Sequence, residues 1–195
     1  MRVLRSRIRR ARGDLEEAES DALLAVAVGR RAAGPQLFVE ALAYRAWRLL
    51  EMGRPSEAVP LLEEVEQAAN SGDFMPIEGA IAMASLGRHA NLANLAGQMI
   101  PGLWHDVFAA FAEDRLTDAV GLLDHHGYKP HAALVRLAIA RQLTAAGDPD
   151  GARGVLEPAV TFWRSVGATY WLADADRLVA DPALGERARA DVRAE

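Results

Sequence analysis

Three histidines lie close together in the sequence, and histidine is the commonest metal ligand in proteins. His125 and His126 are adjacent, Asp124 precedes them, and His131 follows beyond Gly127. Adjacent side chains on a helix point in different directions, whereas a helical metal site places its ligands four residues apart on one face. A loop that ends a helix explains these residues as well, so no metal ligand is predicted.

Other arrangements that could support catalysis are also incomplete. The acidic pairs Glu63–Glu64 and Asp174–Asp176 could serve acid–base chemistry, but the sequence shows neither a base partner nor an apolar pocket for them. The chain has no cysteine, which excludes a thiol nucleophile, disulfides and thiolate metal sites. Its one lysine, Lys129, is followed by proline, so the Gly-Lys-Ser/Thr loop that binds phosphates is absent. We therefore predict no catalytic residue, no cofactor and no enzymatic activity.

The first dozen residues are strongly basic, with arginine at positions 2, 5, 7, 9, 10 and 12. They could bind phosphate groups. The alternative is an amphipathic helix with most arginines on one face and, on the other, Val3, Leu4, Ile8 and Ala11. The net charge of the whole chain is −5, and no aromatic residues are interleaved with the arginines. The helix is therefore favoured over binding to nucleic acid or anionic lipid.

No segment has the composition of a membrane span or a secretory signal. The basic residues are followed at once by acidic ones, beginning with Asp14 and Glu16, and not by an apolar run. No stretch approaches the roughly 20 apolar residues that a membrane helix needs. We expect a cytoplasmic protein with no membrane partner.

Four short segments share a pattern in which a turn residue precedes an alanine by five positions. The turn residues and their alanines are Gly13 and Ala18, Gly53 and Ala58, Asp114 and Ala119, and Gly147 and Ala152. Glycine, and less readily aspartate, adopts the left-handed conformation that ends a helix. An alanine fits where two helices approach closely. Each segment therefore predicts a tight turn between two helices.

A fifth turn is expected at Gly87, which divides the longest interval between these positions. That copy is degenerate, because Leu92 stands where the small residue belongs and Ala93 comes one place late. Apolar residues around the turns recur at helical spacing, and no alternating β-branched run is found. We predict an all-α, right-handed solenoid of about five hairpins over residues 1–180. A capping helix over 169–179 closes it, and residues 181–195 form a polar tail.

The turn pattern resembles the tetratricopeptide-repeat family. The copy that matches best contains Ile139-Ala140, Leu143, Gly147-Asp148, Ala152, Leu156 and Ala159. The stretch over 156–169 is similar to the terminal repeat of large actinobacterial regulators, which join an ATPase and a nucleotidyl cyclase or LuxR-type DNA-binding output domain to a helical-repeat region. This chain contains neither the ATPase nor the cyclase. The resemblance therefore implies a sensor or docking region and transfers no catalytic residue.

In such arrays the first helix of each hairpin lines a concave groove. Counting back from the turns places seven side chains near that face: Tyr44, Trp47, Glu51, Ile81, Trp104, Phe108 and Arg141. Aromatic residues and arginine anchor interfaces, although buried aromatics in a core are the common alternative. We predict a protein–protein interaction module of a bacterial signalling or transcriptional regulator that binds a partner helix or peptide in this groove. The alternatives are an intramolecular packing or oligomerisation segment of a larger signalling ATPase or cyclase, and a small-molecule sensor.

The two ends of the array are expected to differ. The last hairpin can be covered by Trp171, Leu172, Ala175, Leu178 and Val179. The first hairpin begins without a preceding repeat, so a covering neighbour is missing for Leu23, Leu24, Val26 and Val28. We expect this N-terminal hairpin either to fray or to form a homodimer.

Overall fold

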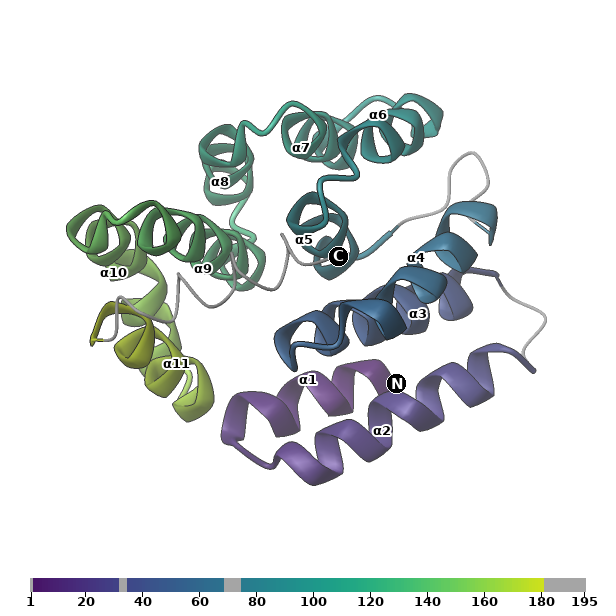
Figure 1. The fold of residues 1–195 in the computed structure, drawn as a ribbon, viewed down its shortest axis with the longest axis horizontal. Coiled ribbons are helices and arrows are strands. Elements are labelled where there is room, and N and C mark those ends of the chain that lie inside the picture. Colours follow the sequence, from purple (N-terminus) through teal and green to yellow (C-terminus); the bar gives the residue numbers. More distant parts are fainter. Residues whose placement is uncertain (1, 32–34, 69–74, 181–195) are drawn as a thin grey trace. The chain divides into compact units, whose positions relative to one another are not determined.

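The structure, a computed structural model, describes residues 2–31, 35–68 and 75–180, which fold into eleven helices and contain no strand (Figure 1). The helices are α1 (Arg2–Arg12), α2 (Leu15–Gly29), α3 (Pro35–Glu51), α4 (Pro55–Ala68), α5 (Ile77–Ser85), α6 (His89–Gln98), α7 (Leu103–Ala112), α8 (Leu116–His125), α9 (Lys129–Ala146), α10 (Pro149–Ser165) and α11 (Thr169–Ala180). The prediction of an all-α protein is confirmed over these ranges. The predicted polar tail, 181–195, lies outside them.

The chain divides into two compact units. Unit 1 comprises Met1–Arg10 and Asp14–Leu122, and unit 2 comprises Ala11–Gly13 and Leu123–Glu195. The boundary falls inside α8, so residues 1–180, expected as one domain, are described below as two units. Across the described ranges, every helix is too short or too polar to cross a membrane.

The turns fall where the sequence places them. Left-handed backbone occurs at Gly13 (φ 94°), Gly53 (φ 67°), Gly87 (φ 68°), Asp114 (φ 55°) and Gly147 (φ 85°). Asp114 is the one non-glycine residue with positive φ in the described ranges, as its place in the repeat pattern requires. After Gly147, the amide of Gly151 donates to Oδ1 of Asp148 at 2.8 Å and so caps α10. All five predicted turns are confirmed.

The alanine that follows each of the four clear turns is fully enclosed. An exposure of 0% is found for Ala18, Ala58, Ala119 and Ala152. In the degenerate copy, Leu92 is buried and Ala93 is exposed, so a leucine occupies the alanine's place in α6. These buried positions explain why the spacing between turn and alanine recurs in the sequence.

In unit 1, α3 packs against α2, α4 and α5, and α5 also contacts α6 and α7 (Figure 1). The contact between α3 and α5 is close at Gly79, where an added Cβ would lie 2.9 Å from Cβ of Ala43. A glycine at this helical position therefore allows α5 to approach α3. Nearly all of α5 is buried, from Ile77 to Met83.

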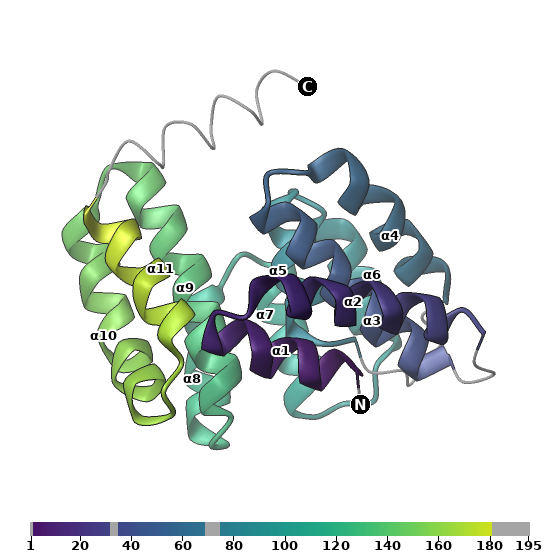
Figure 2. The same cartoon turned by 90° about the horizontal axis from the view of Figure 1, so that it is seen from below.

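In unit 2, α9, α10 and α11 lie side by side, and α11 packs on both of the others (Figure 2). The ring of Trp163 in α10 stacks on that of Trp171 in α11, with centroids 6.0 Å apart and planes inclined by 23°. Trp171 and Ala175 are buried, and the remaining residues predicted to cover the hairpin are half-buried. The helix predicted over 169–179 is confirmed as α11.

The N-terminal helix forms as predicted, but it turns a different face to the core. Leu4 is 56% exposed and Ile8 is 45% exposed, whereas Ser6 and Arg10 are 0% exposed. Of the predicted apolar face, Val3 is buried. The apolar face of this helix is therefore not packed as a whole against the core. The reason is that carboxylates on α2, α3 and α5 receive the arginines of α1 at the helix contacts.

Candidate functional site

Four of the residues predicted to line a groove lie in the core of unit 1. Tyr44 and Phe108 are 0% exposed, and Trp47 and Ile81 are 4% exposed. Side chains buried to this degree fill the core and offer no surface to a partner. The alternative considered for the aromatic residues, burial in a core, therefore holds for these four positions.

The other three predicted groove residues lie in different surroundings. The side chain of Glu51 is 5% exposed and contacts Arg10. Trp104, at the start of α7, is half-buried. Arg141 belongs to unit 2, where its Nη2 donates to Oδ2 of Asp174 at 2.9 Å. The seven residues therefore do not form one surface within either unit.

The basic face of α1 is bound to α2 through one buried carboxylate, that of Asp21. Nε of Arg5 donates to Oδ2 at 2.7 Å, Nη1 of Arg9 donates to Oδ2 at 2.8 Å, and Nη1 of Arg2 donates to Oδ1 at 3.5 Å. Residues 2, 5 and 9 share one face of a helix, so all three reach the same acceptor. The hydrogen bond from Arg5 lowers the pKa of the Asp21 carboxyl below its ordinary value, against the opposing effect of burial.

A second set of ion pairs, made by Arg7, joins α1 to α3 and α5. Nε of Arg7 donates to Oε1 of Glu78 at 2.6 Å and its Nη2 to Oε2 at 3.0 Å, while its Nη1 donates to Oε1 of Glu40 at 2.9 Å. Burial lowers the pKa of Arg7, but the two carboxylates outweigh it and the pKa is raised overall. Glu78 is 2% exposed, so the carboxylate of this bidentate pair is buried, whereas the side chain of Arg7 is 30% exposed.

Arg10 is the most deeply buried cation of α1. Its guanidinium carbon lies 4.6 Å from the ring centroid of Trp47, and its side chain contacts the carboxylate of Glu51. One turn away, Oγ of Ser6 donates to the carbonyl of Ala18 at 2.6 Å and lies 3.1 Å from the Tyr44 hydroxyl. Burial raises the pKa of Tyr44.

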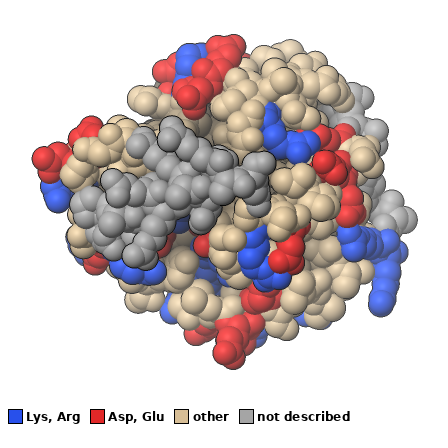
Figure 3. Space-filling model, viewed as in Figure 1, with Lys and Arg blue, Asp and Glu red and all other residues tan. Residues whose placement is uncertain are grey.

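These contacts engage, within unit 1, five of the six arginines that could have bound phosphate groups: Arg2, Arg5, Arg7, Arg9 and Arg10. Figure 3 shows acidic and basic side chains interspersed over the face in view. The spacing of Arg2, Arg5 and Arg9 on one helical face was visible in the sequence. Their shared acceptor, Asp21 on the next helix, was not, and the acceptors of Arg7 and Arg10 come from helices more distant in the chain.

An apolar stripe lies on the outer face of α2. Leu23 is 52% exposed, Leu24 is 39% exposed and Val28 is 48% exposed, and Ala27 between them is also exposed. The opposite face of α2, which includes Ala18, Ala22, Ala25 and Val26, is buried in unit 1. We term Leu23, Leu24, Ala27 and Val28 the α2 patch. Three of the four residues expected to lack a covering neighbour are thus exposed, while Val26 is buried.

The α2 patch continues onto α3. Val28 and Leu37, which is 56% exposed, line a shared hollow of about 180 Å³ together with Val3, Ala25 and Ala41. Charged residues border this hollow, since Arg2 and Glu40 also line it. The surface is therefore an apolar stripe with a shallow pocket at one end.

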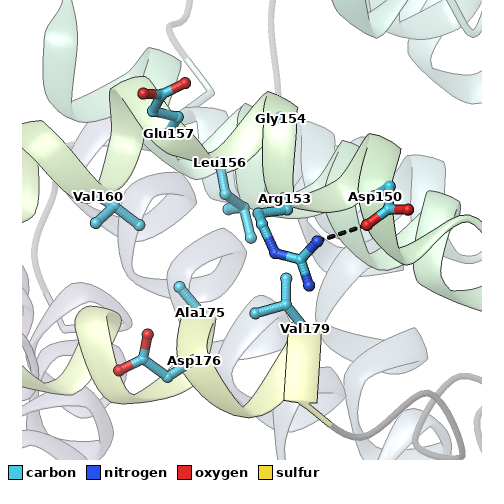
Figure 4. A pocket seen from close by; sticks show the side chains of 9 residues that line it. All are labelled: Asp150, Arg153, Gly154, Leu156, Glu157, Val160, Ala175, Asp176 and Val179. Atoms are coloured by element: carbon cyan, nitrogen blue, oxygen red, sulfur yellow. Dashed lines mark hydrogen bonds and ion pairs between the residues drawn. The ribbon is translucent and has the colours of Figure 1, made fainter.

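Unit 2 carries a groove of about 640 Å³ between α10 and α11 (Figure 4). Its apolar surface comes from Leu156 and Val160 of α10 and from Ala175 and Val179 of α11. We term it the C-terminal groove.

The charged residues of the C-terminal groove stand at its edges. Arg153 reaches from α10 toward α11, and its Nη1 donates to Oδ1 of Asp150 at 2.5 Å (Figure 4). The carboxylates of Glu157 on α10 and Asp176 on α11 point away from the apolar surface (Figure 4). A small-molecule site usually has polar groups that converge on the ligand. The C-terminal groove instead has an apolar floor, and its charged groups stand at the edges and do not converge.

The residues considered for metal binding or acid–base chemistry do not come together. The rings of His125 and His126 meet edge to face at 5.0 Å, and Asp174 is occupied by Arg141. Within the described part of the chain, no three residues among histidine, aspartate and glutamate are grouped so that they could hold a metal ion.

Comparisons with known proteins give no relative: no protein-family model, no curated protein and no solved structure matches this chain.

Proposed function

We propose that this protein is a protein–protein interaction module of a regulatory system and that it binds a partner helix through the α2 patch. The observation that carries the proposal is that α2 carries apolar residues on two opposite faces. One face packs in unit 1, and the opposite face exposes two leucines, an alanine and a valine. Contiguous exposed apolar surface marks an interaction site more often than single exposed residues do.

The geometry of the patch favours a helix as the partner. Leu24 and Val28 are four residues apart, as are Leu23 and Ala27, so the four side chains form two parallel rows along α2. Rows at this spacing interdigitate with the ridges of a second helix. The patch therefore suits an apolar helical face better than an extended peptide.

Charges at the two ends of α2 would orient that helix. Glu16 and Glu17 are exposed at its first turn, and Arg30 and Arg31 are exposed just beyond its last. Nη2 of Arg30 donates to Glu64 at 2.6 Å. A partner helix with basic residues near Glu16 and Glu17 and an acidic residue near Arg31 has complementary charges, which set direction more than affinity.

The helical arrangement supports the same proposal. Helices joined in pairs by tight turns, with a buried alanine after each clear turn, are compatible with a right-handed solenoid of about five tetratricopeptide-like hairpins. Arrays of this kind bind proteins, and we propose that this one is a non-catalytic sensor or docking region of a signalling or transcriptional regulator. Its binding surface would be the outer face of α2 and not the groove expected from the aromatic residues.

The experiment compares two single substitutions of exposed apolar residues in the full chain. Leu24→Asp places a charge in the α2 patch, and Ile100→Asp places one at a residue that is 78% exposed elsewhere in unit 1. Each protein is used for affinity capture from the host, with quantitative mass spectrometry. A partner lost with Leu24→Asp by about tenfold and retained with Ile100→Asp supports the proposal, because a central apolar contact is worth more than 1 kcal/mol.

Two other results would count against it. Equal recovery of every partner with both variants would mean that the α2 patch is not the binding surface. Light scattering that shows a dimer, lost in Leu24→Asp and kept in Ile100→Asp, would identify a second copy of this chain as the occupant in place of a different protein. Circular dichroism on both variants checks that the helices are retained.

A further inference from the structure

We propose that unit 2 binds a small aromatic carboxylate, carrying a hydroxyl or amino group on its ring, in a hollow between α9 and α10. The proposal does not depend on the function assigned to the α2 patch, which belongs to unit 1. It rests on a cation without an ion-pair partner, on an apolar floor that includes a phenyl ring, and on acceptor oxygens along α10.

The hollow has a volume of about 510 Å³ and lies wholly within unit 2. Small-molecule sites usually measure roughly 300–1,000 Å³. Three helices line it, with Asp124 from the end of α8, side chains from the first two turns of α9, and side chains of α10 between 157 and 165. Unlike the C-terminal groove, this hollow is lined by charged groups, hydroxyls and an aromatic ring together.

Lys129, the only lysine of the chain, supplies a positive charge to the hollow. Arg136 lies two turns later in α9, and its Nη1 donates to Oδ1 of Asp124 at 3.2 Å, so this guanidinium is already compensated. Lys129 is exposed in the first turn of α9, and no described residue forms an ion pair with it. The positive end of the α9 dipole adds to its charge, so an anionic ligand group is favoured beside Lys129.

The charges around Lys129 favour a ligand with a single negative charge. Asp124 and Glu157 also line the hollow, so carboxylates are already present on α8 and α10. A ligand carboxylate balances the ammonium of Lys129. A phosphate monoester carries about −1.5 to −2 at pH 7 and would bring excess negative charge near both carboxylates.

The floor of the hollow favours an aromatic body. Ala133 of α9 and Ala159 of α10 are each 1% exposed, and Phe162 of α10 is half-buried. Alanine side chains leave space above them, and the ring of Phe162 can pack against a second ring in an offset-stacked or edge-to-face arrangement. A planar ring therefore suits this floor better than a bulky aliphatic group.

Two hydroxyls of α10 can only accept hydrogen bonds from a ligand. Oγ1 of Thr161 donates to the carbonyl of Glu157 at 3.0 Å, and Oγ of Ser165 donates to the carbonyl of Phe162 at 2.7 Å. Each hydroxyl has one proton, which these bonds use, so the oxygens offer lone pairs to the hollow. A hydroxyl or amino group on the ligand's ring would donate to this side, while the carboxylate faces Lys129.

Calorimetric titration of the full chain with 6-hydroxy-2-naphthoate tests the proposal. Lys129→Met removes the ammonium. Arg164→Met is the matched control, because Arg164 is an exposed cation next to Ser165 that does not line the hollow. We expect Lys129→Met to weaken binding about tenfold and Arg164→Met by less than about twofold. The uncharged 6-hydroxy-2-naphthamide should bind equally to the parent and to Lys129→Met, and 2-naphthoate, without the ring hydroxyl, should bind the parent more weakly than 6-hydroxy-2-naphthoate does.

A second measurement needs no substitution. Because Lys129 is the only lysine, its acetylation by an activated ester can be followed by mass spectrometry of the peptide that contains it. At a probe concentration of about ten times Kd, 6-hydroxy-2-naphthoate should slow this acetylation about tenfold by mass action. This result stands even if a variant failed to fold.

Four results would overturn the proposal. Neither heat nor protection of Lys129 at millimolar 6-hydroxy-2-naphthoate would show that the hollow binds no aromatic carboxylate. Equal weakening by Lys129→Met and Arg164→Met would show only general attraction of an anion. Binding that survives Lys129→Met and is lost with Leu24→Asp would place the probe on the α2 patch. Tighter binding of 6-hydroxy-2-naphthyl phosphate than of the carboxylate would assign the hollow to a dianion.

Discussion

Arg5 of α1 holds Asp21 of α2 by a hydrogen bond from its Nε to Oδ2 at 2.7 Å, and its Nη2 contacts the other carboxylate oxygen. Arg2 and Arg9 donate to the same side chain. The contact between the first two helices is therefore built around one carboxylate. This arrangement leaves Leu4 and Ile8, which a helical projection assigns to the interior, on the surface of unit 1.

Replacing Asp21 by asparagine should destabilise unit 1 and change its dependence on pH. The pKa of Asp21 is lowered in the folded protein by the hydrogen bond from Arg5, so the ionised carboxylate stabilises unit 1 above the ordinary pKa of about 3.9. That stabilisation is lost as the pH falls below about 4 toward the lower folded pKa. We expect the free energy of unfolding of the parent to fall in this window. That of Asp21→Asn should fall less, because this variant lacks the contribution of the ionised carboxylate already at pH 7.

Chemical denaturation from pH 7 to pH 3 measures this effect. Asp150→Asn is the control, because Asp150 also pairs with an arginine but its side chain is 89% exposed. Parallel pH profiles for the parent and Asp21→Asn would show that the carboxylate does not contribute as inferred.

Ala152→Leu should destabilise unit 2. Ala152 is 0% exposed and follows the turn at Gly147 by the spacing that places alanine between helices. A leucine there overpacks the contact, at a cost of roughly 1–3 kcal/mol. Ala173→Leu, at an exposed position of α11, should change stability by less than about 0.5 kcal/mol. Equal melting temperatures for the two variants would contradict the assigned packing of Ala152.

The turns could be predicted because each rests on a local property of one or two residues. A left-handed residue and a buried alanine recur at fixed spacing, and Asp114 satisfies the pattern although it is not glycine. The inner face of α1 could not be predicted in this way. Its packing depends on Asp21, Glu51 and Glu78, which three other helices, α2, α3 and α5, bring to α1.

The surface proposed to bind a partner also shows the difference between what local sequence predicts and what the packing of neighbouring helices decides. Aromatic residue type suggested Tyr44 and Phe108 as partner contacts, yet both are enclosed, because a side chain's exposure is decided by the neighbouring helices. The exposure of Leu23, Leu24 and Val28 was expected from their place in the first hairpin. Position in the first helical hairpin was thus more informative about this surface than the residue type.

Two helical glycines should respond in opposite directions to alanine. At Gly79 a Cβ would lie 2.9 Å from Cβ of Ala43, which belongs to the adjoining helix α3 and cannot rotate away. Gly79→Ala should therefore destabilise unit 1 by roughly 1–3 kcal/mol. At Gly97, in α6, a Cβ meets nothing within 4 Å, and Gly97→Ala should stabilise by about 0.5–1 kcal/mol through helix propensity. The melting temperatures of both variants test this prediction. A gain in stability for Gly79→Ala would mean that α5 and α3 are farther apart than the structure places them.

Arg10→Met should be among the most destabilising substitutions in unit 1. Methionine retains much of the apolar stem but removes the cation that contacts Glu51 and lies 4.6 Å from the ring centroid of Trp47. Because both partners are buried, loss of one leaves the other's charge poorly compensated. Arg48, whose Nη1 lies 3.6 Å from Oε2 of Glu51, relieves part of that penalty. We expect a loss of about 3 kcal/mol in the free energy of unfolding.

Two further variants separate the ion pair from the packing. Arg153→Met removes an arginine whose side chain is 61% exposed and ion-paired with Asp150, and it should cost less than about 1 kcal/mol. Glu51→Gln added to Arg10→Met removes the buried charge and should restore at least about 1 kcal/mol, since a neutral amide is less costly to bury than an unpaired carboxylate. Denaturant unfolding combined with hydrogen exchange of α1 and α3 reports on unit 1 in each case. If the double substitution were no more stable than Arg10→Met alone, the loss would come from packing against Trp47, and the ion pair with Glu51 would not hold α1 to α3.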